Sequence, residues 1–511
     1  MRLNSFRLAL WDDVANVQTP LPDMPGAVVR VYPASGAVAM LPLTPANNYT
    51  PTILFCGGSN MPDEAWGNYS FPWINTWTYP ASNDCQRITP EPQDGSAPVY
   101  VQDDDMLEGR TMGQFITLPN GKLLVINGGL NGTAGYAQST LLTPSFSQMP
   151  FGESLASGPV DTPAIYDPNA APGSRWSNAG LSTSTIARLY HSSAMLLPDG
   201  SVLVAGSNPN VDVNLTTVFP TTYQAEIFYP PYFSASTRPA PSGMPQNLTY
   251  GGPSFDITIP ASSYSGSANA AAESATCVIQ RGGFTTHAMN MGQRLMQLNN
   301  TYTVNADGSI ILHVAQPPPN PNLFTPGPAF MFITVLGIPS NGSYLIVGSG
   351  QIGTQPTLPA SVLPPSILLS SASGTASNTT STSTNNTVDN HTTGSHLAVL
   401  IGSVVGGIAV LAVLGATIGI CLARRKRAAD RMAPSTEYPM AASGPGVRFS
   451  DSSAFVPLRT GASTTSLVDP LYREGSPYRD SRNSNNFYRG SMDGDPYAAV
   501  QPRAEVPHRG Y

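Results

Sequence analysis

Three stretches of the first 237 residues share one pattern: an apolar run, a turn that opens with proline and closes with glycine, and a second apolar run. The stretches are VVRVYPASGAVAMLPL, GQFITLPNGKLLVINGG and SSAMLLPDGSVLVAGSN, with turns at 33–36, 119–121 and 198–200. Proline early and glycine late suit the backbone angles of a hairpin turn. The pattern therefore predicts three antiparallel hairpins, with partner strands at TPAIYDPN and YQAEIFYPP.

A repeat of such sheet units predicts a kelch-type β-propeller over residues 18–237. Gly121 follows Gly36 by 85 residues and Gly200 follows Gly121 by 79, so the units carry long insertions relative to a kelch period of about 50 residues. Three units, or four, are fewer than the roughly four to eight blades of most propellers. We expect an incomplete propeller; an ordinary β-sandwich with coincidental turns is the alternative.

The composition agrees with an all-β protein and excludes some partners. Fifty prolines and 47 glycines in a chain that is 41% hydrophobic indicate short strands and many loops. Only 11% of the 511 residues are charged and the net charge is −7, so no basic face for nucleic acid is expected. Four cysteines without a CxxC pair do not make a dense disulfide framework.

Residues 238–352 predict a separate β-sandwich. Short alternating runs bounded by turn residues occur at SFDITIP, SATCVIQRG, GSIILHVAQ, AFMFITVLG and SYLIVG. Residues 353–396, rich in Ser, Thr and Asn, are expected to form an extended glycosylated stalk. Residues 1–17 are left unassigned.

The segment 397–423 has no charged residue and is long enough to cross a hydrocarbon layer of about 30 Å. Arg424, Arg425, Lys426 and Arg427 follow it directly. The positive-inside rule then predicts a single-pass cell-membrane protein with residues 1–396 outside and a disordered cytoplasmic tail over 424–511. A buried core helix is the alternative.

Potential N-glycosylation sites support this orientation. Ten Asn-x-Ser/Thr sequons precede the apolar segment and none follows it. Glycosylation requires exposure outside the cytoplasm, so the asymmetry favours an external N-terminal part. The ten are Asn48, Asn68, Asn131, Asn214, Asn247, Asn299, Asn341, Asn378, Asn385 and Asn390.

Histidine is scarce, and only His191, His287 and His313 fall in the two predicted folded domains. His191 follows Tyr190 at the mouth of the third hairpin. Neighbouring side chains of a regular strand point to opposite faces, so Tyr190 and His191 can serve one site only at an irregular strand entrance. His287 lies in a glycine-flanked loop that can reach another domain, whereas His313 alternates within a strand.

Two imidazoles and a phenol suit a tetragonal copper(II) ion. Tyr190, His191 and His287 are therefore the candidate metal ligands. The alternative is a tyrosine packed in the sheet beside a surface histidine.

Several segments resemble copper radical oxidases of the fungal glyoxal oxidase and galactose oxidase type. They include ARLYHSSAMLLPDGSVLVAGSNPN, VYPASGAVAMLPLTPANNYTPTILFCGGSNMPD, GRTMGQFITLPNGKLLVINGGLNGTAGYA, YQAEIFYPPYF and THAMNMGQR, in order over residues 18–350. The resemblance implies a propeller followed by an immunoglobulin-like early-set sandwich. It also implies that Tyr190 is the axial phenolate and catalytic base, and that His191 and His287 are the equatorial copper ligands.

The same resemblance implies oxidation of small aldehydes or alcohols by O₂, with acids and H₂O₂ as products. The family pairs copper with a radical on a tyrosine that is cross-linked to a cysteine, and this Cys–Tyr cofactor is not found in the sequence. Tyr136 is the nearest substitute radical site, and Cys56 and Cys85 match family positions that could pair as a disulfide. We expect that the N-terminal blades are missing, through an incomplete gene sequence or a truncated paralogue.

Three functions remain open at this point. The first is a membrane-anchored copper radical oxidase that makes H₂O₂ at the cell surface. The second is a catalytically silent surface protein that binds cell-wall glycan or another protein. The third, a signalling receptor, rests on the inner tail alone, for which a solvated anchor is the simpler interpretation.

Overall fold

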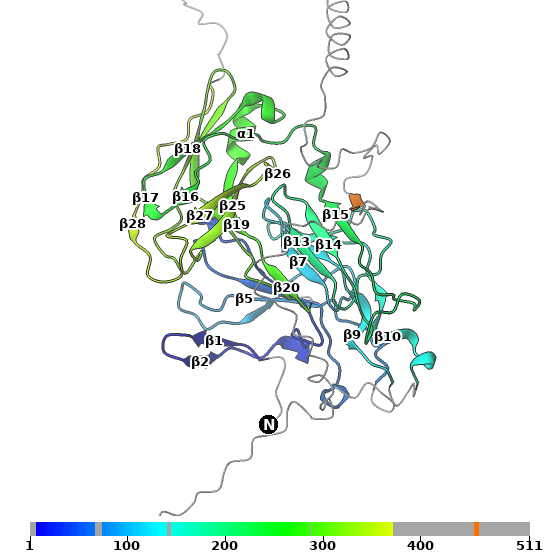
Figure 1. Cartoon of the computed structure of the whole chain (residues 1–511). Coiled ribbons are helices and arrows are strands. Elements are labelled where there is room, and N and C mark those ends of the chain that lie inside the picture. The colour runs from blue at the N-terminus through cyan, green and yellow to red at the C-terminus, as the bar shows by residue number, and fades with distance from the viewer. Residues whose placement is uncertain (1–6, 67–73, 140–144, 288, 371–453, 459–511) are drawn as a thin grey trace, which may run out of the picture. The chain divides into compact units, whose positions relative to one another are not determined.

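The computed structural model describes residues 7–66, 74–139, 145–287, 289–370 and 454–458 (Figure 1). Strands make up nearly all of the regular structure in these ranges, and the one α-helix among them is α1, Ala268–Ser274. The all-β prediction is confirmed.

Three four-stranded antiparallel sheets are built from strands of residues 37–229, and the third also includes β29 from residues 454–457. Their strand orders are β3-β4-β5-β6 in the first sheet, β12-β11-β8-β7 in the second and β13-β14-β15-β29 in the third. The bounds are β3 Ala37–Met40, β4 Ile53–Cys56, β5 Cys85–Ile88, β6 Tyr100–Gln102, β7 Gln114–Thr117, β8 Leu123–Ile126, β11 Ala164–Tyr166, β12 Trp176–Ser177, β13 Ser193–Leu196, β14 Val202–Ala205, β15 Ala225–Tyr229 and β29 Ala454–Pro457.

Two of the three predicted hairpins are present. β7 pairs with β8 and β13 pairs with β14 across the predicted turns. The first prediction is wrong, because the turn at 33–36 is not flanked by two paired strands. It leads into β3, which pairs instead with β4 across the longer connection 41–52. The residues before the turn cannot complete the hairpin, since Val29 forms its bridge with Ser59.

The three sheets match the number of clear units predicted, but closure into a propeller remains a prediction. This part of the chain also contains two antiparallel ribbons of two strands each. One pairs β1 (Ala9–Asp12) with β2 (Val17–Pro20), within and just after the range left unassigned, and the other pairs β9 (Gly129–Tyr136) with β10 (Pro150–Pro159).

The fourth strand of the third sheet corrects one expectation for the tail. Residues 454–457 were expected to be disordered, but they form β29 and pair antiparallel with β15. Phe455 packs on Phe228 with ring centroids 4.9 Å apart, and the Leu458 amide donates to the Ala225 carbonyl at 2.9 Å. This pairing covers an edge that would otherwise expose unpaired backbone groups.

The predicted sandwich is present, and all five predicted segments contain strands. One six-stranded sheet has the order β16-β27-β25-β19-β22 with β26 on β25, and it faces a three-stranded sheet, β18-β24-β23. The bounds are β16 Asn247–Leu248, β18 Phe255–Ile259, β19 Thr276–Arg281, β22 Arg294–Leu298, β23 Asn300–Val304, β24 Ile310–Val314, β25 Gly327–Val335, β26 Ile338–Pro339 and β27 Ser343–Val347.

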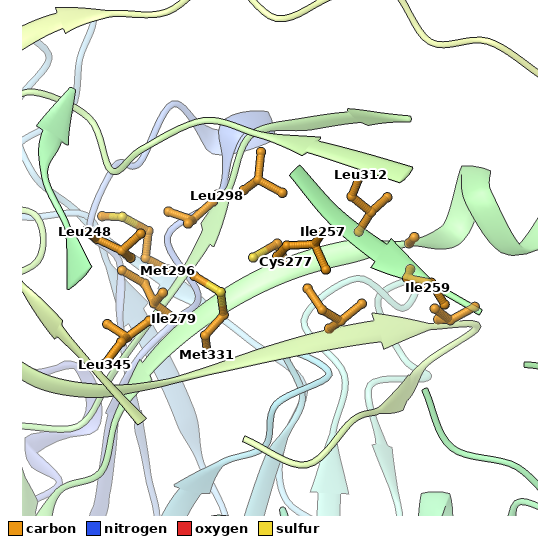
Figure 2. Close-up of a cluster of buried hydrophobic side chains, with 14 of the residues drawn as sticks. Leu248, Ile257, Ile259, Cys277, Ile279, Met296, Leu298, Leu312, Met331 and Leu345 are labelled. Atoms are coloured by element: carbon orange, nitrogen blue, oxygen red, sulfur yellow. The ribbon is translucent and has the colours of Figure 1, made fainter. Parts of the chain in front are cut away.

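The core of the sandwich lies between these two sheets. Inward side chains from both interdigitate there, among them Ile257, Cys277, Ile279 and Leu312 (Figure 2). Alternation along the strands produces this arrangement, because every second residue faces the opposite sheet. The fold of the sandwich therefore follows from the pattern that predicted it.

The first part of the expected stalk is folded. β28 (Thr357–Ala360) pairs in parallel with β17 (Tyr250–Gly252), and Ile367 exchanges backbone hydrogen bonds with Tyr302 and Val304. The sandwich therefore extends beyond residue 352, where it was expected to end. No helix in the described part of the chain is long and apolar enough to cross a membrane. The predicted spanning segment 397–423 lies outside the described residues, as do 371–396 and most of the tail.

Backbone contacts join the sandwich to the sheets. Leu43 exchanges hydrogen bonds with Leu295 and Gln297, at 3.0 and 2.8 Å, and the Gly342 amide donates to the Pro198 carbonyl at 2.8 Å. Hydrogen bonds between backbone groups fix both partners in register. These contacts hold β22 of the sandwich against the β3–β4 connection of the first sheet, and the loop before β27 against the β13–β14 turn of the third sheet.

Candidate metal centre

Tyr190 and His191 occupy the two central positions of a tight turn directly before β13. The Ser192 amide donates to the Leu189 carbonyl at 3.1 Å, which closes the turn. His191 has a φ of 64°, a conformation that turns usually give to glycine or asparagine at this position. The irregular strand entrance required by the sequence is therefore present, and it stacks the two rings with centroids 3.7 Å apart.

Polar contacts from neighbouring segments hold the backbone of this turn in place. The Asn208 amide donates to the Tyr190 carbonyl at 2.7 Å, and the Leu189 amide donates to the Ser207 hydroxyl at 3.1 Å. Just before the turn, the buried Arg188 guanidinium pairs with the Glu226 carboxylate on β15 at 2.8 Å. These contacts fix the backbone on both sides of Tyr190.

His287 comes from the sandwich, on a hairpin between β20 (Phe284–Thr286) and β21 (Met289–Met291). Thr286 pairs with Met289, so His287 takes the first loop position, where its φ of 52° suits a two-residue hairpin turn. The Thr286 hydroxyl lies 2.7 Å from His287 Nδ1. That contact uses one ring nitrogen and restricts rotation of the imidazole.

Side-chain hydrogen bonds dock this hairpin on the neighbouring sheets. The Asn290 amide donates to the Phe115 carbonyl of β7 at 2.9 Å, and the Thr285 hydroxyl donates to the Ala194 carbonyl of β13 at 3.2 Å. A loop of the sandwich thus reaches the turn that precedes β13.

The three side chains predicted as metal ligands are brought together. The ring centroid of His287 lies 5.5 Å from that of His191 and 5.8 Å from that of Tyr190. Tyr190 and His191 lie directly before β13 of the third sheet, and His287 lies in a loop of the sandwich. Contact between the two modules is therefore what assembles the cluster.

Two more tyrosines border the cluster. The Tyr136 ring, on β9, lies 6.2 Å from the Tyr190 ring between centroids. Tyr32, which was not predicted, places its hydroxyl 3.4 Å from the Tyr190 hydroxyl and its ring 5.4 Å from that of His287. The sequence signal was a tyrosine directly before a Pro-Gly turn that leads into a strand, but the wrong prediction of a hairpin there placed Tyr32 in a strand arm.

Burial shifts the protonation of both residues of the turn. Loss of solvent, followed by the contact with Tyr32, raises the pKa of Tyr190. Loss of solvent and the nearby His287 lower the pKa of His191. At neutral pH His191 is therefore neutral and has a nitrogen lone pair to offer to a metal ion.

The donor set fits copper(II). No group of three His, Cys, Asp or Glu side chains suited to a metal is found in the described residues, which leaves two imidazoles with phenol oxygens. Such N and O donors suit tetragonal Cu(II). The third histidine of the folded part, His313, is a strand residue as predicted and pairs with Asp256 at 2.7 Å.

The cross-linked Cys–Tyr group does not fit the residues that the structure describes. Cys56 and Cys85 form a disulfide between β4 and β5, as the resemblance suggested. Cys277 is the free cysteine of the described chain, and it is buried in the sandwich core, where burial raises the pKa of its thiol. No thioether partner for a tyrosine of the cluster is therefore available there.

Comparison with known families gives the same two modules. Residues 10–232 match the family model described as glyoxal oxidase N-terminus, and residues 238–347 match the galactose oxidase-like early set domain. Together they define a two-module protein of the galactose oxidase-like class. The chain belongs to the glyoxal oxidase family, and its match begins at residue 10, earlier than the resemblance from residue 18 indicated.

Curated relatives support this assignment. The chain is 32% identical over 354 residues to aldehyde oxidase GLOX1 of Arabidopsis thaliana, covering 67% of this chain and 52% of the relative. It is 33% identical over 340 residues to aldehyde oxidase GLOX of Vitis pseudoreticulata, covering 65% and 57%. The chain thus spans about half the length of the curated relatives it matches.

A solved structure is also similar. It is a fungal alcohol oxidase of the AA5 family in complex with copper, with a TM-score of 0.46 and 17% identity, covering 67% of this chain and 60% of that chain.

Proposed function

We propose that the chain is a copper-dependent oxidase that converts small aldehydes, or alcohols, with O₂. For an aldehyde the balanced reaction consumes one water and one O₂ and yields the acid and H₂O₂. The observation that carries the proposal is the cluster of Tyr190, His191 and His287 across two modules. The similarity to relatives named aldehyde oxidases supports the substrate class.

The residues divide the work according to their chemistry. His191 and His287 would hold copper, which supplies one-electron redox chemistry when bound. Tyr190 would be held as the phenolate, rather than the neutral phenol, by the charge of bound copper, and the phenolate oxygen would accept the substrate proton. The anchored turn and the docked hairpin hold these groups before substrate arrives, which lowers the entropic cost of the reaction.

The test measures copper content and peroxide release by the full chain with glyoxal and methylglyoxal. We expect bound copper and peroxide in the wild type, and loss of both in His287→Ala. His313→Ala is the matched control, because His313 contacts Thr303 and Asp256 in the sandwich and should leave copper in place. Equal copper content in wild type and His287→Ala would contradict the proposal.

A catalytically silent surface protein that binds glycan or protein is the second candidate. The observation in its favour is that no described cysteine can supply the family's thioether to the cluster. This candidate predicts neither stoichiometric copper nor peroxide, so the same experiment separates the two functions.

We further propose that residues 397–423 anchor the chain in the cell membrane, with its N-terminal domains outside and its C-terminus in the cytoplasm; in an anchored chain, residues 454–457 would then not pair with β15 of the same chain. The uncharged segment followed by Arg424–Arg427 and the one-sided sequons support this orientation. Protease treatment of intact cells, followed by detection of an epitope at each end, tests it: only the N-terminal epitope should be lost.

A further inference from the structure

Tyr32 contacts two of the three candidate ligands, one from each module. Its hydroxyl lies 3.4 Å from the Tyr190 hydroxyl. Its ring stands edge-on to His287, with centroids 5.4 Å apart and planes at 82°. A phenol oxygen thus lies beside Tyr190 within the cluster.

The turn that carries Tyr32 is fixed at both ends. The Ser35 amide donates to the Val31 carbonyl at 2.9 Å, and the Gly36 amide donates to the Arg30 carbonyl at 2.8 Å. The next residue, Pro33, accepts a hydrogen bond at 2.8 Å from the amide of Ala134 on β9. The backbone of Tyr32 is therefore held in place by contacts that do not depend on its side chain.

Tyr136 provides the comparison. Tyr32 and Tyr136 are similarly exposed, at 49% and 42%, so exposure does not distinguish them. Their contacts do, because Tyr136 touches the Tyr190 ring, whereas no ring contact with His191 or His287 involves it in the described residues. Tyr32 is therefore the better placed of the two phenols.

We propose that Tyr32 supplies a second phenol oxygen to the copper site. This inference rests on the proposed function. The donor set becomes two imidazole nitrogens, from His191 and His287, and two phenol oxygens, from Tyr32 and Tyr190, which suits tetragonal copper(II). Because Cys56 and Cys85 are joined to each other and Cys277 is buried in the sandwich, no cysteine of the described residues supplies a thioether to Tyr32.

The experiment titrates Cu(II) into the full chain and records the visible phenolate-to-copper absorption, the electron paramagnetic resonance spectrum and the affinity. The variants are Tyr32→Phe, Tyr190→Phe and the matched control Tyr136→Phe. We expect Tyr32→Phe to lose part of the absorption band, to change the copper hyperfine splitting and to bind copper at least about tenfold more weakly. Tyr136→Phe should behave as the wild type.

The outcomes separate the inference from the function on which it rests. Copper bound by the wild type with unchanged spectra and affinity in Tyr32→Phe overturns this inference and leaves the proposed function standing. A wild type that binds no copper overturns both. Circular dichroism of each variant shows whether it is folded, and Tyr32→Phe keeps the aromatic ring in place.

Discussion

Arg188 and Glu226 form an ion pair that is buried on both sides, with Arg188 Nη2 2.8 Å from Glu226 Oε2 and both side chains 3% exposed. The Ser184 hydroxyl donates to the same carboxylate at 2.9 Å. Arg188 also donates to the Gly206 carbonyl at 2.7 Å. The pair thus ties the backbone that leads into Tyr190 to the third sheet.

Removing one member of this pair should destabilise the protein strongly. Glu226→Ala leaves a buried guanidinium without a counter-charge, and we expect a loss of about 3–5 kcal/mol in the free energy of unfolding. The double variant Arg188→Met with Glu226→Leu leaves no unpaired charge and should lose less. Urea denaturation of the full chain measures both; a double variant that is less stable than Glu226→Ala would argue against this account.

The backbone of His191 makes a second prediction. Its φ of 64° favours glycine over other residues, so His191→Gly should be about 1 kcal/mol more stable than His191→Ala. Both variants should lose copper. Thermal denaturation compares their stability, and equal melting temperatures would contradict the positive φ.

Asp161 gives a prediction about pH. Burial and the nearby Glu226 raise the pKa of Asp161 to about 6. Because the pKa in the folded chain exceeds that in the unfolded chain, ionisation of Asp161 opposes folding as the pH rises from about 4 to 6. Asp161→Asn should therefore be more stable than the wild type at pH 7, and the difference should vanish below pH 4. A constant difference from pH 4 to 7 would refute this.

The disulfide between Cys56 and Cys85 supports the first sheet, since it joins paired residues of β4 and β5. The two cysteines are 29 residues apart in sequence. Closing a loop of that size stabilises a fold by about 3–4 kcal/mol in the chain-entropy treatment. Cys56→Ser with Cys85→Ser should lower the unfolding free energy by that amount, whereas Cys277→Ser, which leaves the disulfide intact, reports only on packing in the sandwich.

The pairing of β29 with β15 should protect backbone amides of β15 from hydrogen exchange with solvent. Deleting residues 454–458 should expose the edge of β15, because β29 supplies the hydrogen bonds on that side. Amides of β15 should then exchange with solvent faster. Deleting residues 459–511 is the control and should leave their exchange unchanged; equal protection after both deletions would show that the pairing is not maintained in solution.

Much of this architecture could be predicted from local pattern. Alternating apolar residues identified the strands of the sandwich, and Pro-Gly turns identified the hairpins at 119–121 and 198–200. The hairpin at 33–36 failed because its first arm bonds elsewhere, through Val29 and Ser59, a choice made by distant residues. A turn residue shows where the chain bends, but it does not show which strand pairs next.

The candidate site likewise combines residues that could be predicted from local sequence with one that depends on distant contacts. Tyr190 and His191 could be predicted as a pair because they are adjacent in sequence. His287 could be predicted because few histidines fall in the folded domains. Tyr32 lies far from all three along the chain, and its contact with Tyr190 depends on how the turn at 31–36 rests on β9. Long-range packing of this kind leaves no periodic signal in a single sequence.

The pairing of β29 with β15 sets a condition on topology. If residues 397–423 cross a bilayer once, the residues after them lie on the opposite side from the residues before them. Phe455 then cannot contact Phe228 of the same chain. A chain with this pairing has residues 225–229 and 454–457 on the same side of the membrane. A single membrane crossing by residues 397–423 and the pairing of β29 with β15 in one chain therefore exclude each other.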